Sequence, residues 1–216
     1  MINFRTLTIA LTLAAVSLAG CGGGDGSAGP PPAVTTQILS DPAFDGDIEQ
    51  TSPTSFTVTQ GMSATVQSVF AGIDPVALTE FRTFLDFPLT GPGGIPRTAI
   101  IDRAFLDIYI NSLQPSSGTL PLLIELVSFE PPTLIPSDFD RGAQPPLASI
   151  SVSPPFIGSD VGTNVSIDVT SLMVEAQNRG LSDFQVRVME DLGPAIPVLM
   201  EINDTTGANR ATLAPE

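Results

Sequence analysis

Apolar and polar residues alternate with a period of two along most of the chain after about residue 35. The clearest alternating segments are residues 104–110, 150–152, 165–170 and 184–188. Such alternation is typical of strands that bury one face and expose the other. Residues 120–127 are apolar on both faces except at Glu125. We therefore expect this segment to lie in the middle of a sheet, where both of its faces are covered.

Proline and glycine separate these segments. The turns that this punctuation predicts are at residues 91–94, 115–118, 131–132, 145–146, 154–155 and 204–207. Strands and helices do not alternate along the chain, as a parallel sheet would require. The pattern therefore predicts an all-β domain over residues 35–216, an antiparallel jelly-roll-like β-sandwich with one short helix.

The helix is expected directly after the alternating segment 165–170. Thr170 is the predicted N-cap, residues 171–179 continue the helix, and Gly180 ends it. The residues predicted to form its buried stripe are Leu172, Met173 and Ala176. A helix of two to three turns at this place is expected to close one end of the sandwich.

The first 20 residues have the composition of a signal peptide. Arg5 precedes an apolar run over residues 7–18. A run of this length is short for a membrane span but suits the apolar part of a secretion signal. The segment therefore predicts export of the chain, with residues 1–20 removed.

The run ends in Leu18-Ala19-Gly20-Cys21, which resembles the bacterial lipobox. The resemblance implies that the chain is cut before Cys21 and that this residue carries the lipid. Gly22 follows Cys21 where an aspartate would favour retention in the inner membrane, so the resemblance implies an outer-membrane lipoprotein that faces the periplasm or the cell surface. The alternative is an ordinary secretion signal that happens to contain a cysteine. Residues 21–34 are rich in glycine and proline and predict a tether.

The composition excludes several kinds of function. The chain has 216 residues, a net charge of −15, eight basic residues that are all arginine, and no histidine. Without histidine or lysine there is no Ser–His–Asp triad, no Schiff base and no P-loop lysine. A lone cysteine without histidine gives no thiolate zinc site and no internal disulfide. The negative charge argues against nucleic acid as a partner. We expect no enzymatic activity, since only carboxylate pairs could supply it.

Several short motifs resemble the DNRLRE-type domain of secreted and surface bacterial proteins. They are the segments 82–89, 95–96, 100–106, 167–172 and 201–213, in the order in which that family has them. The resemblance implies a jelly-roll-like β-sandwich similar to carbohydrate-binding modules, some members of which bind polysaccharide. The chain lacks the tryptophan that most members carry. The resemblance also predicts a further apolar strand beyond Glu216, without which one sheet would lack an edge partner.

Aromatic side chains are the expected platform for a sugar ligand. Tyr109 is the only tyrosine, and Phe84 and Phe105 are predicted to share an outer sheet face with it. The alternative is that these rings pack inside the domain. Arg82 and Arg187 could contact a sugar, although ion pairs on the sheet surface are the expectation for both.

Two groups of acidic residues are candidates for calcium, which prefers oxygen ligands. The first group is Asp41, Asp45, Asp47 and Glu49, and the second is Asp138 and Asp140. Neither has the spacing of an EF-hand loop. We interpret them as solvated loop acids and expect no cofactor, with a structural calcium as the weaker alternative.

The sequence therefore predicts a membrane-anchored, non-catalytic binding module whose ligand could be a polysaccharide. The alternative is a structural or assembly lipoprotein that holds a protein partner through a sheet edge or an apolar face. A calcium-stabilised adhesion module is a third reading.

Overall fold

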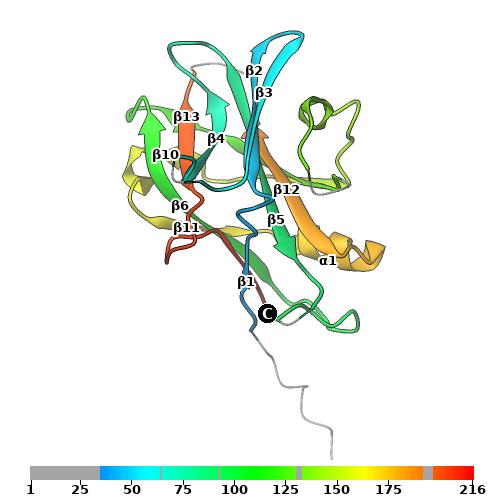
Figure 1. The fold of residues 1–216 in the computed structure, drawn as a ribbon. Helices are drawn as coiled ribbons and strands as arrows, with labels where there is room; N and C mark the ends of the chain where they lie inside the picture. The colour runs from blue at the N-terminus through cyan, green and yellow to red at the C-terminus, as the bar shows by residue number, and fades with distance from the viewer. Residues whose placement is uncertain (1–34, 64, 92, 130–132, 192–196) are drawn as a thin grey trace, which may run out of the picture. The chain divides into compact units, whose positions relative to one another are not determined.

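A computed structural model describes residues 35–63, 65–91, 93–129, 133–191 and 197–216, which belong to one compact unit. The predicted signal peptide, lipobox and tether lie outside the described residues. The strands are β1 (Ile38–Leu39), β2 (Gly46–Ser52), β3 (Ser55–Gln60), β4 (Ser68–Ile73), β5 (Glu80–Pro88), β6 (Ala104–Gln114), β7 (Thr119–Leu120), β8 (Leu122–Val127), β9 (Ala148–Ser151), β10 (Phe156–Ile157), β11 (Asn164–Asp168), β12 (Asp183–Glu190), β13 (Leu199–Asn203) and β14 (Thr212–Pro215). The helices are α1 (Thr170–Arg179) and the 3-10 turns η1 (Pro136–Phe139) and η2 (Gly158–Asp160) (Figure 1).

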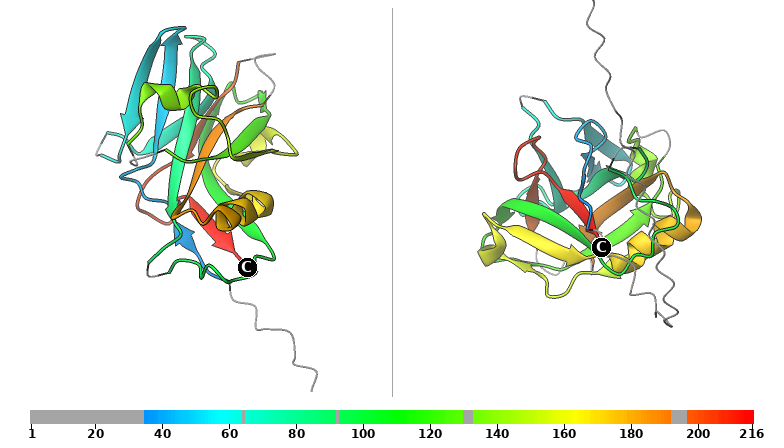
Figure 2. Two further views of the ribbon diagram at one scale, coloured as in Figure 1. Left: turned by 90° about the vertical axis from the view of Figure 1, so that its right-hand side faces the viewer. Right: turned by 90° about the horizontal axis from the view of Figure 1, so that it is seen from below.

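All strand pairs are antiparallel. β7 and β10 form a separate two-stranded sheet, and the other strands form an open sheet that is bent into two layers (Figure 2). The path β9-β8-β12-β5-β4-β13-β6 continues into β14 and β1, while β11 pairs with the other edge of β6. The long strand β6 joins the layers, since residues 104–107 pair with β14 and residues 110–114 pair with β13. The predicted antiparallel, sandwich-like fold with one short helix is thus confirmed.

The main hydrophobic core lies between the two layers. Its members include Ala104, Leu106, Ile108 and Ile110 of β6 and Phe184, Val186 and Val188 of β12. These are the apolar positions of the period-two pattern, and all seven are at most 1% exposed. β8 lies between β12 and β9, so the doubly apolar segment is an inner strand, as predicted.

A second, smaller core covers the outer face of the sheet around β5. It consists of Ile48, Phe84, Val127, Phe129, Leu134 and Phe139. The rings of Phe84 and Phe129 meet edge to face, with their centroids 5.9 Å apart. The segment around η1 supplies Leu134 and Phe139, so this connection is packed against the sheet and shields it from water.

One ion pair lies inside this shielded region. Nε of Arg187 donates to Oε2 of Glu125 at 2.8 Å, and both side chains are 0% exposed. Nη1 of Arg187 also donates to the main-chain oxygen of Asp138, which ties η1 to β12. The expectation of a surface ion pair at Arg187 is therefore wrong, because the η1 segment covers this part of the sheet. The pairing of Arg82 with Glu80 is more exposed, as expected.

Helix α1 begins one residue earlier than predicted. Thr170 is the first helical residue and Val169 is the N-cap, whereas Thr170 was predicted as the cap. The side chain of Asp168 accepts hydrogen bonds from the main-chain N–H and the hydroxyl of Thr170. Leu172, Met173 and Ala176 are buried and Gly180 ends the helix with φ 67°, as predicted.

The last strand has partners on both sides. β14 pairs with β6 through Thr212–Pro215 and with β1 through Leu213 and Thr212. The short strand β1 therefore lies at the edge of the sheet next to β14.

Candidate functional site

A polar hollow lies where β2 and β4 diverge on either side of β5. It has a volume of about 400 Å³ and is lined by Asp47, Thr59, Thr65, Val66, Gln67, Ser68, Phe70, Phe81 and Glu201. We call it the Phe70–Phe81 hollow. β4 pairs with β5 only at Gly72 and Ile73, so its first half separates from β5, while it remains paired with β13, and opens this space.

Two side chains hold the main chain of Phe70 in place after β4 leaves β5. Its N–H donates to Oδ2 of Asp47 at 3.2 Å, and its carbonyl accepts from the hydroxyl of Thr83 at 2.7 Å. β2 and β5 therefore hold Phe70 through side chains, in addition to its ladder pairing with β13.

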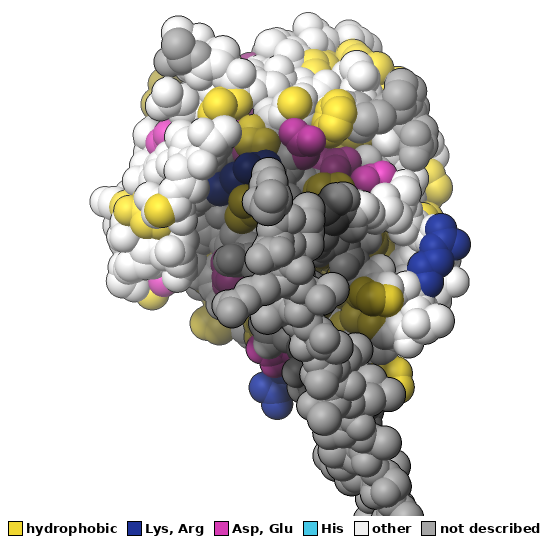
Figure 3. Space-filling model, turned by 60° about the horizontal axis from the view of Figure 1, so that its bottom comes forward, with side chains coloured by type: hydrophobic (Ala, Val, Ile, Leu, Met, Phe, Trp, Pro, Cys, Tyr) yellow, Lys and Arg dark blue, Asp and Glu magenta, His cyan; other side chains and the backbone are white. Residues whose placement is uncertain are grey.

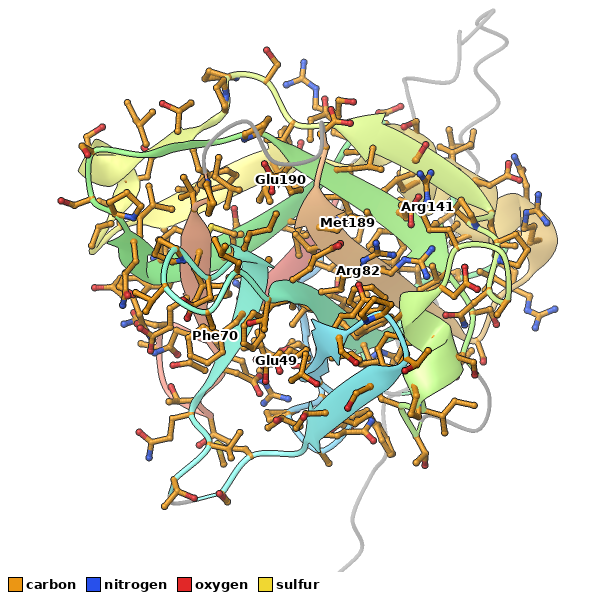
Figure 4. All side chains as sticks on the ribbon, turned by 90° about the horizontal axis from the view of Figure 1, so that it is seen from above. Glu49, Phe70, Arg82, Arg141, Met189 and Glu190 are labelled. Carbon is orange, nitrogen blue, oxygen red and sulfur yellow. The ribbon has the colours of Figure 1, made fainter. Side chains whose placement is uncertain are left out.

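Two aromatic rings form one wall of the hollow. The centroids of Phe70 and Phe81 are 5.8 Å apart, and the ring planes are tilted by 57°. Both side chains are only half-buried, so part of each ring is open to a ligand. In Figure 4 Phe70 and Glu49 lie near each other, well away from Arg141.

Glu201, the partner of Phe70 in the pairing of β13 with β4, is held firmly beside the two rings. Its Oε1 accepts from the hydroxyl of Ser68 at 2.7 Å, and its Oε2 accepts from the hydroxyl of Ser112 at 2.9 Å. The amide of Asn111 donates to Ser68 and, at 3.4 Å, to Glu201. The carboxylate thus has a fixed orientation before any ligand arrives, which lowers the entropy cost of binding.

Asp47 is the side chain of the hollow whose pKa is shifted toward neutral pH. Burial raises its pKa to about 7, the hydrogen bond from Phe70 opposes this, and the charges of Glu49 and Asp204 add to the increase. Near neutral pH the side chain is therefore shared between a carboxylic acid, which can donate a hydrogen bond, and a carboxylate, which only accepts.

The three aromatic residues predicted as a ligand face do not lie together. Phe84 is 0% exposed in the second core, so its predicted place on an outer ligand face is wrong. Phe105 and Tyr109 are half-buried and alternate with the buried Leu106 and Ile108 on β6, so they point to the outer side of that strand. Neither lines the Phe70–Phe81 hollow.

The acidic groups also differ from the expectation of solvated loops. Asp45, Asp47 and Asp138 are 0%, 3% and 6% exposed, whereas Asp140 is exposed. Asp45 faces Asp204, and burial together with this neighbouring charge raises the pKa of Asp45 well above its usual range. Within the ranges that the structure describes, no group of three or more His, Cys, Asp or Glu side chains is placed to hold a metal ion.

Sequence reasoning missed Phe70, Phe81, Glu201 and Asp204. A signal was present for Phe70, because Ser68 and Phe70 alternate with the buried Val69 and Ala71. Nothing in the sequence shows that Phe81 and Glu201, which are 120 positions apart, face the same hollow.

The surface carries few basic side chains, and those on the face seen in Figure 3 lie apart from one another. Among the described residues, no helix is both long enough and apolar enough to cross a membrane. The fold and the hollow together define an antiparallel, β-rich sheet domain with one aromatic and acidic concavity. No family model matches the chain, and no curated protein matches it.

Proposed function

We propose that the chain is a non-catalytic, membrane-anchored module that binds polysaccharide in the Phe70–Phe81 hollow. The observation that carries the proposal is the open pair of rings next to hydroxyl and carboxylate groups that are already oriented. A sugar ring offers C–H groups to an aromatic face and hydroxyl groups to polar side chains. The hollow supplies both kinds of contact within one concavity. The motif similarity to DNRLRE-type domains, some of which bind polysaccharide, agrees with this function.

The charge of the site selects among glycans. Both ionisable groups that line the hollow are acidic, namely Asp47 and Glu201, and the chain has a net charge of −15. An anionic polymer would be repelled at low ionic strength. The ligand class is therefore a neutral or a cationic polysaccharide.

The test is affinity electrophoresis of the full chain in gels that contain mannan, β-glucan, xylan or chitosan, with alginate as the anionic comparison. We expect slower migration in at least one of the first four gels and none in alginate. Phe70→Ala should abolish the retardation because it removes one ring of the pair.

Tyr109→Ala is the matched control, since it removes a half-buried ring from β6 outside the hollow. It should leave the retardation unchanged, and thermal melts should show that both variants fold. If none of the glycans slowed the migration of the chain, the proposed function would be contradicted. Retardation lost with Tyr109→Ala and kept with Phe70→Ala would move the site to the outer face of β6.

We further propose that acylated Cys21 anchors this module in the outer membrane. The support is the lipobox-like segment 18–21 and the tether-like composition of residues 21–34. Several acyl chains on one residue make anchoring effectively permanent, since each buried CH₂ contributes about 0.8 kcal/mol. Expressed in a bacterium that acylates lipoproteins, the chain should sediment with membranes, and Cys21→Ser should shift it to the soluble fraction. Equal sedimentation of both forms would contradict the anchor.

A further inference from the structure

A second concavity, larger than the hollow, opens at the side of the sandwich between β9 and β11. Its volume is about 660 Å³, and it is lined by residues 150–156, Asp160, residues 165–168, Thr170 and Ser171. We call it the edge slot. It shares no residue with the Phe70–Phe81 hollow.

One wall of the edge slot is the free edge of β11. This strand pairs only with β6, and the N–H of Val169 donates to Ala104 while the carbonyl of Thr163 accepts from Ile110. In an antiparallel pair the residues that bond to the partner alternate with residues whose main-chain groups point away. The main-chain N–H and C=O of Ser166 therefore point away from β6.

The other wall is the free edge of β9, which pairs only with β8. The N–H of Val152 donates to the carbonyl of Leu122, so Val152 is a position that bonds to β8. Its neighbour Ser151 is therefore a position that does not. Its main-chain groups point away from β8 by the same alternation. Two strand edges with available hydrogen-bonding groups thus border one slot.

The floor of the slot is apolar. Ile150, Val152 and Val165 line it and are partly buried hydrophobic residues packed on the main core. A strand lying in the slot would present every second side chain to this floor and the others to water. The geometry therefore fits a segment whose residues alternate between apolar and polar.

The charged side chains of the slot determine which charge the polar residues of a bound segment should carry. Asp160 and Asp168 are the charged residues among its lining, and both are acidic. Asp168 is exposed, so its carboxylate can meet a cation at the rim. Complementary charges steer and orient such an encounter.

We propose that the edge slot binds an extended, basic segment of a partner protein by strand addition. Main-chain hydrogen bonds to β11 and β9 hold the segment, apolar side chains contact the floor, and basic side chains face Asp160 and Asp168. This proposal does not depend on glycan binding, because it uses a different part of the molecule.

The test is a fluorescence anisotropy titration of the full chain with the labelled peptide KVKVKVK, with EVEVEVE as the charge-reversed comparison. We expect saturable binding of the first peptide and none of the second. Hydrogen exchange of residues 164–168 should slow when the peptide is bound, because their outward N–H groups then gain partners.

Ser166→Pro removes the outward N–H donor and should weaken binding at least tenfold. Ser166→Ala is the matched control, since it keeps the main-chain donor, and its affinity should stay within twofold of the parent. Equal binding of both peptides, or unchanged affinity in Ser166→Pro, would overturn the proposal. So would dimers seen by gel filtration without peptide and lost in Ser166→Pro, because a second copy of the chain would then fill the slot.

Discussion

At the scale of single residues, the most consequential side chain is the buried guanidinium of Arg187. Burial lowers its pKa, while the charge of Glu125 and the hydrogen bond to it act in the opposite direction. Besides Glu125, the guanidinium contacts the main-chain oxygens of Asp138 and Gln144. Both of these oxygens belong to the connection that covers the second core. One charged side chain therefore fastens a whole segment to the sheet.

Glu125→Gln should destabilise the fold strongly, because it leaves Arg187 charged, buried and without a counter-ion. Breaking a buried ion pair in this way typically costs about 3–5 kcal/mol. Urea unfolding followed by far-UV circular dichroism measures the change in the free energy of unfolding.

The comparison variant is Glu175→Gln, which removes an exposed ion pair with Arg179 on helix α1. Such a pair contributes about 0.5 kcal/mol or less. A Glu125→Gln variant as stable as Glu175→Gln would show that Arg187 gains solvent or another partner when its pair is lost.

At the scale of elements, alternation alone was sufficient to predict the strands β6, β9, β11 and β12. β6 follows the pattern residue by residue over 104–110, and the inner position of β8 follows from its two apolar faces. The apolar positions of β12 face the main core as predicted, but its polar positions are buried as well. These predictions succeed because burial acts separately on each strand and leaves a local signature. The cap of α1 was misplaced by one residue because Thr170 is already helical and Val169, which has no capping side chain, takes the cap position, while Asp168 accepts from the N–H of Thr170.

The binding regions could not be predicted in the same way. Phe84 has an aromatic ring on the outer face of β5, as the pattern indicated, but the segment around η1 covers it. The Phe70–Phe81 hollow and the edge slot depend on where strands diverge or end, which is set by distant parts of the chain. Periodicity says which face of a strand is apolar, but not what lies on top of it.

At the scale of the whole molecule, three buried carboxyl groups link stability to pH. The pKa of Asp47 is raised to about 7 and that of Asp204 to about 6, and the pKa of Asp45 lies well above its usual range. Desolvation is the largest cause in each case. These groups have ordinary pKa values near 3.8 when the chain unfolds, so between pH 4 and 7 the folded state holds more protons than the unfolded state. Stability must then fall as the pH rises through this interval.

We therefore expect the melting temperature of the full chain to be higher at pH 5 than at pH 8. Each carboxyl that is protonated only in the folded state lowers the free energy of unfolding by about 1.4 kcal/mol for each unit by which the pH rises. Differential scanning calorimetry across this interval measures the slope, and Asp47→Asn should make it shallower.

Added salt separates this effect from repulsion among surface acids. High ionic strength screens exposed charges but has little influence on buried groups. The slope should therefore persist in 0.5 M NaCl, an amount of salt that screens charges beyond roughly 4–5 Å. A melting temperature that rises with pH, or a slope that vanishes in salt, would contradict a role for the buried acids.

The pairing of β1 with β14 has a consequence for how the domain can be built into larger molecules. The N–H of Thr36 donates to the carbonyl of Pro215, so the two ends of the described domain lie side by side. Figure 1 shows both ends at the bottom and the β2–β3 hairpin at the top. A reporter fused after Glu216 would therefore sit next to the N-terminal end of the described domain, away from the β2–β3 hairpin (Figure 1). Joining the ends through a short linker and opening the chain at the exposed hairpin tip should give a circular permutant with the same strand pairing.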